Sequence, residues 1–282
     1  KGTNNTRSQG HRFGLRLEHK FSKNTSILFQ PQVNFGSGNF NEISQFETFS
    51  EREGASQPQQ TNDGYTNNNG NNKNVSTSGF LLFRQKLGKP GRTISANVRY
   101  SFSNNNLDGK NQSLTNFRQE DEQVSKSDTW SEEIINQRID QYSKSASLSG
   151  RVVYTEPLAE FFFLEANYQY SWNRNTSFKN TYNSGSDLIE DGMLIFNPEG
   201  EYLDDTYSNR ISNMSQNHRA GANISYQKEK FRAQLGASYN PTITDNVTTG
   251  HDPYHSVTHN WSPQAMLNYE FNDNSHIRFF YF

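Results

Sequence analysis

The feature that most constrains this fold is a two-residue alternation of apolar and polar side chains in residues 142–173. One face carries Tyr142, Ala146, Leu148, Val152 and Tyr154, and the residues between them are mostly Ser or Arg. A break containing Pro157 follows, and the alternation resumes from Phe162 to Asn173. Side chains alternate across a strand, so the pattern predicts a hairpin with one apolar and one polar face. Each arm has about ten residues or more, the length that a tilted strand needs to cross a bilayer.

The composition agrees with strands in a membrane better than with a soluble domain. Only 31% of the residues are hydrophobic and the mean hydropathy is -0.98, yet aromatic residues reach 13%. A disordered chain would be poor in aromatics, and a soluble core of this size would need more aliphatic residues. A membrane barrel needs only one apolar outer layer, because its lumen and loops are polar. No apolar run approaches the ~20 residues of a spanning helix.

Charge and cysteine content exclude other classes of protein. The net charge of -2 provides no strong field for nucleic acid. The 282-residue sequence has no cysteine, so it has no disulfide framework and no thiolate chemistry. The first ten residues are polar and do not form a signal peptide, so we expect the start of an exported precursor to be missing here.

The same alternation recurs along the whole chain and predicts ten strands. The second can continue over residues 40–49, beyond an irregularity at Gly36 and Gly38. The predicted strands are residues 11–21, 25–35, 75–87, 92–102, 142–154, 162–173, 214–226, 231–239, 257–271 and a last one that begins at 277.

The connections alternate between short and long, as in transmembrane barrels with tight periplasmic turns and longer extracellular loops. The short turns are expected at Ser22–Asn24, Gly88–Gly91, Lys228–Lys230 and Asn272–Ser275. Polar loops are expected over residues 51–74, 104–136, 173–210 and 242–253, with a small strand at Met193–Phe196. This order puts both ends of the chain on the extracellular side. We therefore expect residues 1–282 to be one segment of a larger barrel, with the remaining strands and any plug domain absent.

The apolar face of each strand is expected to meet lipid, so the polar face should point into the barrel. The polar residues on that inward face are the candidate functional residues. They form a structural network in the lumen, line a substrate path or contact a plug. The lumen-facing candidates are Arg16, Arg84, Arg99, Arg151, Glu165 and Arg232.

The sequence contains no motif that predicts catalysis, a cofactor or a metal site. His255 and His259 share a strand face but would stand about 13 Å apart, too far for one metal ion. The carboxylates between Asp187 and Asp205 match no calcium-loop spacing, and a solvated acidic loop is the simpler interpretation. No nucleophile elbow, phosphate-binding loop or dinucleotide fingerprint is present. We therefore expect a protein that is not an enzyme.

Three sequence segments carry a family resemblance: HRFGLRLEHKFS, SANVRYSFSNNN and FNDNSHIRFFYF. They resemble the outer-membrane β-barrels of the TonB-dependent-receptor type. The resemblance implies an all-β, antiparallel, up-and-down barrel of roughly twenty-two strands, about ten of them in this chain, in the bacterial outer membrane. It also implies an N-terminal plug, a TonB-type energy-coupling partner engaged through an absent N-terminal region, and outer-membrane lipid around the wall. A surface lipoprotein is a further partner that it allows.

The leading functional hypothesis is an importer barrel whose polar loops capture an unidentified ligand. The alternative is a passive porin or surface-binding barrel without energy coupling; an outer-membrane enzyme and a soluble β-rich adhesin are weaker hypotheses. The membrane interpretation makes two structural predictions. The turns Leu87–Gly91 and Lys228–Lys230 should lie at the same end of the sheet. The following residues should be exposed on its outer surface: Phe162, Leu164, Tyr168, Tyr170, Leu235, Ala237, Leu267 and Tyr269.

Overall fold

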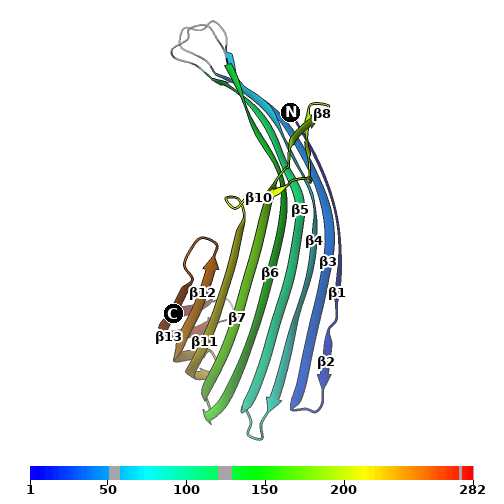
Figure 1. Cartoon of the computed structure of the whole chain (residues 1–282). Coiled ribbons are helices and arrows are strands. Elements are labelled where there is room, and N and C mark those ends of the chain that lie inside the picture. Colours follow the sequence, from blue (N-terminus) through cyan, green and yellow to red (C-terminus); the bar gives the residue numbers. More distant parts are fainter. Residues whose placement is uncertain (51–57, 120–128, 273–274, 282) are drawn as a thin grey trace.

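The computed structural model describes residues 1–50, 58–119, 129–272 and 275–281, and its regular elements in these ranges are all strands. Figure 1 shows one curved wall of long strands. The order in the main sheet is β1-β3-β4-β5-β6-β7-β11-β12-β13-β14, and every pair along it is antiparallel. Chain neighbours are thus sheet neighbours, which confirms the predicted up-and-down topology. No helix in the described ranges is long and apolar enough to span a membrane.

The sheet has ten lanes, as predicted, because β1 and β2 both pair with β3 and form one lane. The strands are β1 (Gly2–Gly14), β2 (Leu17–Lys20), β3 (Thr25–Ser50), β4 (Gln59–Lys86), β5 (Thr93–Gln119), β6 (Thr129–Ala159), β7 (Phe162–Asn183), β8 (Asp187–Glu190), β9 (Met193–Phe196), β10 (Tyr202–Leu203), β11 (Asn209–Lys228), β12 (Phe231–Thr248), β13 (Tyr254–Asn272) and β14 (Ser275–Tyr281).

The predicted long loops are largely wrong, because the strands continue through them. Within the expected loops, residues 59–74, 104–119 and 129–136 are all strand, and β12 extends to Thr248. The 31 residues of β6 span about 100 Å, several times what a bilayer requires. Beyond the membrane both faces of a strand meet water, so the apolar alternation disappears while the backbone hydrogen bonds continue. Residues 51–57, 120–128 and the turn residues 273–274 lie outside the described part.

The first two lanes also differ from the prediction. The first begins at Gly2, not His11, and is interrupted between Gly14 and Leu17. The irregularity predicted at Gly36 and Gly38 is wrong, because β3 pairs with β4 without a register shift there. These glycines permit close approach instead: a Cβ on them would lie 2.8 and 2.6 Å from the amide oxygens of Asn74 and Asn72.

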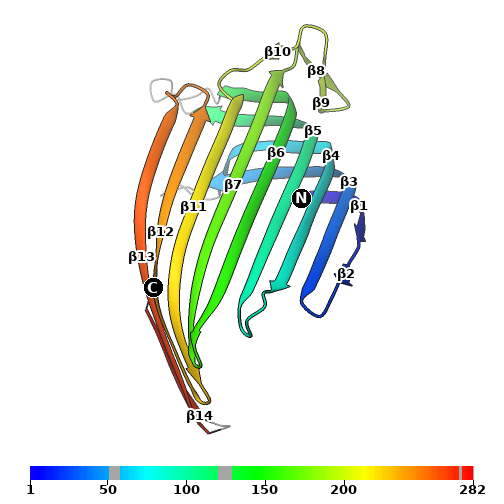
Figure 2. The same ribbon diagram turned by 90° about the horizontal axis from the view of Figure 1, so that it is seen from below.

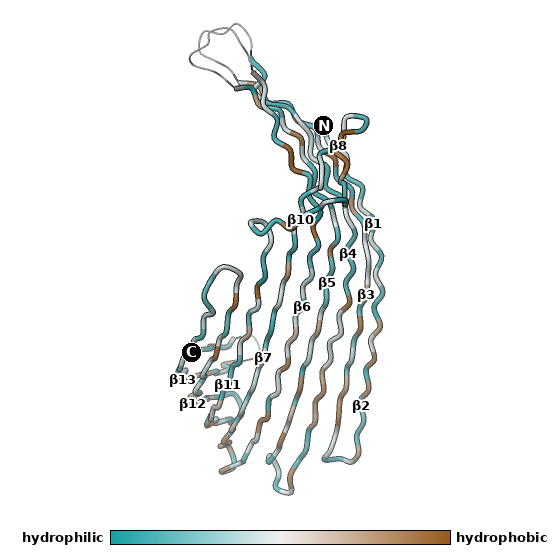
Figure 3. The backbone as a smooth tube through the Cα atoms, viewed as in Figure 1, coloured by the Kyte–Doolittle hydropathy of each residue, from teal (hydrophilic) through white to brown (hydrophobic). Residues whose placement is uncertain are grey.

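The apolar side chains at alternate strand positions lie on the outer face of the wall, as predicted. Of the eight residues named for this test, six are exposed and the other two, Leu164 and Tyr170, are half-buried. None lies between two packed sheets. Figure 3 shows that the upper extension of the wall is largely hydrophilic, whereas hydrophobic segments recur along its lower part.

A small hairpin, β8–β9, folds back beside the upper extension (Figure 1). This confirms the small strand predicted at Met193–Phe196. Asp191 and Gly192 connect the hairpin with φ values of 49° and 77°, the backbone that two-residue hairpin turns require. Leu194 and Phe196 are buried, and the Leu194 N–H donates a hydrogen bond to the Tyr65 hydroxyl of β4.

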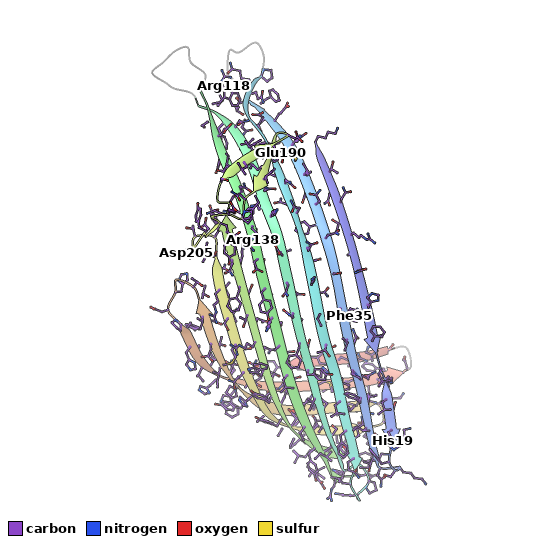
Figure 4. All side chains as sticks on the ribbon, turned by 45° about the vertical axis from the view of Figure 1, so that its right-hand side comes forward. His19, Phe35, Arg118, Arg138, Glu190 and Asp205 are labelled. Atoms are coloured by element: carbon purple, nitrogen blue, oxygen red, sulfur yellow. The ribbon has the colours of Figure 1, made fainter. Side chains whose placement is uncertain are left out.

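The short turns share one rim, which confirms the second structural prediction. Lys89, in the β4–β5 turn, lies 3.5 Å from Glu156 near the β6–β7 turn. The Gln227 N–H, beside the β11–β12 turn, donates a 2.9 Å hydrogen bond to the Phe161 carbonyl. The Lys230 Nζ donates a 3.1 Å hydrogen bond to the Phe271 carbonyl. Figure 4 places His19 near this rim and Arg118 at the far end of the extension.

Candidate functional site on the polar face of the wall

The strand register places all six sequence-predicted candidates on one face. Arg151 stands opposite Asn97 and Gln169, and Arg84 stands opposite Ser95, which shares the parity of Asn97. The other candidates follow from the same pairings: Arg99, Glu165, Arg232 and, from the gap between β1 and β2, Arg16. Their position in a closed lumen stays a prediction.

The wall is curved (Figure 2), and the burial of the polar side chains identifies their face as the concave side. Its side chains are crowded although no second sheet in the described part of the chain covers them: Ser238 is 2% exposed and Asn223 is 5% exposed. On the opposite face Leu235 is 69% exposed and Trp261 is 73% exposed. Curvature therefore converges the polar side chains and spreads the apolar ones.

A groove of about 700 Å³ opens on the polar face between the end of β1 and β6. Arg16 and Arg99 both line it, together with Gln30 and Ser149. The Arg99 guanidinium lies 4.9 Å from the centre of the Phe80 ring, a cation–π distance. Arg16 lies 3.4 Å from Glu18, but both side chains are well exposed, so this ion pair contributes little to stability.

A second, smaller hollow of about 180 Å³ brings Arg151 and Glu165 together. They do not stand opposite each other, because Arg151 pairs with Gln169 and Glu165 pairs with Thr155. The hollow is completed by amides and a further cation: Asn167, Gln169, Arg219, Asn223, Gln234 and Gln264. Such a surface offers donors and acceptors to a polar ligand or to another polar part of the barrel.

Two of the amide side chains in this hollow are joined by a hydrogen bond, and a glycine leaves room for one of them. The Gln264 Nε2 donates a hydrogen bond to the Asn223 Oδ1. Asn223 stands opposite Gly236, and a Cβ there would meet the same oxygen and the Ala222 carbonyl. Gly236 therefore provides the space that the Asn223 side chain occupies.

The sequence-predicted candidates did not include six residues of the hollow: Asn167, Gln169, Arg219, Asn223, Gln234 and Gln264. The signal was present, because Ala220, Ala222 and Ile224 alternate with other residues in the predicted strand 214–226, and the residues between them must point to the polar face. Arg84 and Arg232 lie on the polar face outside the two hollows just described.

The histidines near β13 have separate partners. The His255 Nδ1 lies 2.6 Å from Asp245, whereas the His259 Nδ1 lies 2.6 Å from the Tyr239 hydroxyl.

The acidic residue Asp204, in the segment between β7 and β11, also has partners of its own. Asp204 accepts hydrogen bonds from the Asn183 amide and from the backbone of Thr206 and Tyr207.

The same segment is fastened to the wall by a bidentate ion pair that lies beyond the lipid-facing part of the strands. Arg138 on β6 donates 2.8 and 3.2 Å hydrogen bonds to the two carboxylate oxygens of Glu201. The hydrogen bond from Arg138 lowers the pKa of Glu201 against the opposing effect of desolvation. Hydrogen bonding from the Asn183 amide similarly lowers the pKa of Asp204. Figure 4 shows Arg138, Glu190 and Asp205 gathered in this upper region.

The sequence of the wall matches a known protein family. Residues 85–281 match the model of the "Outer membrane protein beta-barrel family". The chain belongs to this family. A bacterial outer-membrane location follows, and it accounts for an apolar face that no other part of the described chain covers. Among curated proteins, none matches the sequence.

Solved structures similar to this chain are receptors of about twice its length. The import receptor for ferric catecholates, Fiu from E. coli K12, is 11% identical, with 98% of this chain and 48% of that chain covered and a TM-score of 0.44. The siderophore receptor PiuA from Acinetobacter baumannii is 11% identical, with 98% and 48% covered and a TM-score of 0.45. BauA, the ferric preacinetobactin receptor of the same species, is 8% identical, with 96% and 45% covered and a TM-score of 0.43. The chain thus spans about half the length of these structures.

Proposed function

We propose that this chain forms part of the wall of an outer-membrane importer of the TonB-dependent type. The observation that carries the proposal is the concave polar face, on which Arg99, Arg151, Glu165 and Arg219 adjoin two hollows. In a closed barrel this face lines the lumen, where it contacts the passing ligand and a plug. The proposal assigns no catalytic step to the chain.

The long upper extension supports a receptor role. Its strands and the segment between β7 and β11 stand on the side opposite the short turns, so they face the medium. They are rich in amides, and amides donate and accept hydrogen bonds without strong charge preference. This surface is where we expect the first contact with a polar ligand.

Ion conductance of the full-length protein in planar bilayers distinguishes the importer from a passive porin. A plugged importer is closed at rest and conducts when urea unfolds its plug. A passive porin conducts steadily without urea. Steady conductance in the absence of urea would contradict the importer, and so would failure of the protein to bind the periplasmic domain of a TonB-type coupling protein.

The lumen assignment is tested in the same apparatus. The double variant Arg99→Glu and Arg151→Glu should shift the urea-opened conductance towards cation selectivity, because two fixed positive charges become negative. The control is Lys228→Glu, at the short-turn rim. Unchanged selectivity in the double variant would show that the polar face does not line the conducting path.

A further inference from the structure

The outer face of the wall changes chemistry just above its lipid-facing part. On β6 the exposed Leu148 and then Ala146 are followed on the same face by Lys144, and on β7 Trp172 is followed by Arg174. Lys144 and Arg174 are diagonal neighbours across adjacent strands, with side chains roughly 7–8 Å apart at their bases. Both are exposed. Tryptophan followed by a cation is the order expected at a membrane–water interface.

Two aromatic rings support the cations of this region. The Lys144 Nζ lies 4.8 Å from the centre of the Tyr142 ring, and the Arg210 guanidinium lies 4.5 Å from the centre of the Phe178 ring. Tyr142 stands opposite Phe178, which stands opposite Arg210, so three adjacent strands contribute to one cluster. We call Tyr142, Lys144, Arg174, Phe178 and Arg210 the basic patch. Its three cations are exposed and its rings are half-buried.

A polar groove continues from the patch on the same face, away from the lipid. It has a volume of about 930 Å³ and shares Tyr142 with the patch. Amides and two carboxylates form much of its wall, and the side chains of this face that line it are Arg7, Gln9, Ser37, Asn39, Asn71, Lys73, Asn106, Asp108, Asp140 and Tyr142. Amides, carboxylates and a tyrosine hydroxyl are suited to hydrogen bonds with sugar hydroxyls.

We propose that the basic patch and the groove bind the headgroup of a phosphorylated glycolipid in the outer leaflet. Phosphate groups sit on Lys144, Arg174 and Arg210, and the attached sugars enter the groove. The acyl chains then run down the outer face past Trp172 and Leu148. Continuity with the lipid-facing band supports a lipid as the occupant. Charge complementarity supports phosphate, because Arg and Lys supply charge-assisted hydrogen bonds to its oxygens.

The test uses the full-length protein in detergent micelles, with bisphosphorylated lipid A as the probe and the same lipid after dephosphorylation for comparison. The triple variant Lys144→Ala, Arg174→Ala and Arg210→Ala should bind the phosphorylated lipid at least roughly tenfold more weakly than the unsubstituted protein. The unsubstituted protein should itself discriminate against the dephosphorylated lipid by a similar factor.

The matched control is the double variant Lys228→Ala and Lys230→Ala at the opposite rim. Lys228 also lies over an aromatic ring, 5.2 Å from the centre of Phe161, but it faces the inner leaflet, so binding should not change. A folded barrel migrates more slowly on an SDS gel after boiling, and this shift verifies that each variant folds. If the triple variant does not fold, the single variant Lys144→Glu replaces it. Equal binding by all variants, or equal binding of both lipids, would overturn the proposal. A dimer that only the triple variant loses, without an effect on lipid binding, would instead assign the patch to a second copy.

Discussion

At the scale of single residues, the structure separates charges that hold the protein together from charges that remain available. Arg138 and Glu201 form a bidentate pair with both side chains only 26% exposed. The cations of the basic patch are exposed, as are Arg99 and Arg151 on the polar face. A partly buried bidentate pair fixes a segment, whereas exposed cations can meet an incoming anion.

Glu201→Gln should loosen the segment between β7 and β11. The pKa of Glu201 is lowered in the folded protein, so its pairing with Arg138 stabilises the segment above the ordinary pKa of a glutamate. This contribution is lost as the pH falls through the lowered value. We expect a roughly fivefold faster backbone hydrogen exchange in residues 197–208 at neutral pH, measured by mass spectrometry. The difference from the unsubstituted protein should disappear in acid. Glu199→Gln is the control, and equal exchange in both variants would contradict the assigned role.

At the scale of the strand, the stability of the protein should be far more sensitive to a charge on the apolar face than to the same charge on the polar face. Leu235 lies midway along the lipid-facing part of β12, and Gln234 next to it points into the polar hollow. Leu235→Arg should lower the free energy of unfolding by about 2–4 kcal/mol, because it moves a charge into hydrocarbon. Gln234→Arg should change it far less. Urea-induced unfolding in lipid vesicles, followed by tryptophan fluorescence, measures both. A larger loss for Gln234→Arg would reverse the assignment of the faces.

At the scale of the whole molecule, the orientation of the wall in the membrane can be tested with single cysteines, since the sequence has none. Asp191 at the tip of β8–β9 should face the medium, and Glu229 in the β11–β12 turn should face the periplasm. Both have positive φ values, 49° and 42°, so a cysteine carries a similar backbone cost at each. A membrane-impermeant maleimide should label Asp191→Cys in intact cells and label Glu229→Cys only after the outer membrane is opened. The opposite labelling pattern would show that the wall has the reverse orientation in the membrane.

The predictable part of the fold is the part in contact with lipid. Where one face of a strand must be apolar, as from Phe162 to Trp172, the sequence predicts the strand, its two faces and the extent of its lipid-facing part. Above the membrane that requirement disappears. Residues 59–74, rich in asparagine, were therefore expected to form a loop and are a strand with partners on both sides.

The candidate site was predictable to the same extent. Parity placed Arg99, Arg151 and Glu165 on the polar face, and it would have placed Arg219 and Asn223 there as well. It could not show which of them share a hollow, because that depends on register between strands that are distant in the chain. Gln264 reaches Asn223 only because β12 lies between their strands and Gly236 leaves room for the contact.

By itself, the sequence determined the number of lanes, the direction of each strand and the side that meets lipid, because hydrocarbon imposes a two-residue period that the residues must carry. Tertiary structure alone decided how far the strands rise above the membrane, where the β8–β9 hairpin docks and which cations meet over Tyr142 and Phe178. Backbone hydrogen bonds and cross-strand register govern those features, and neither leaves a periodic mark on the side chains.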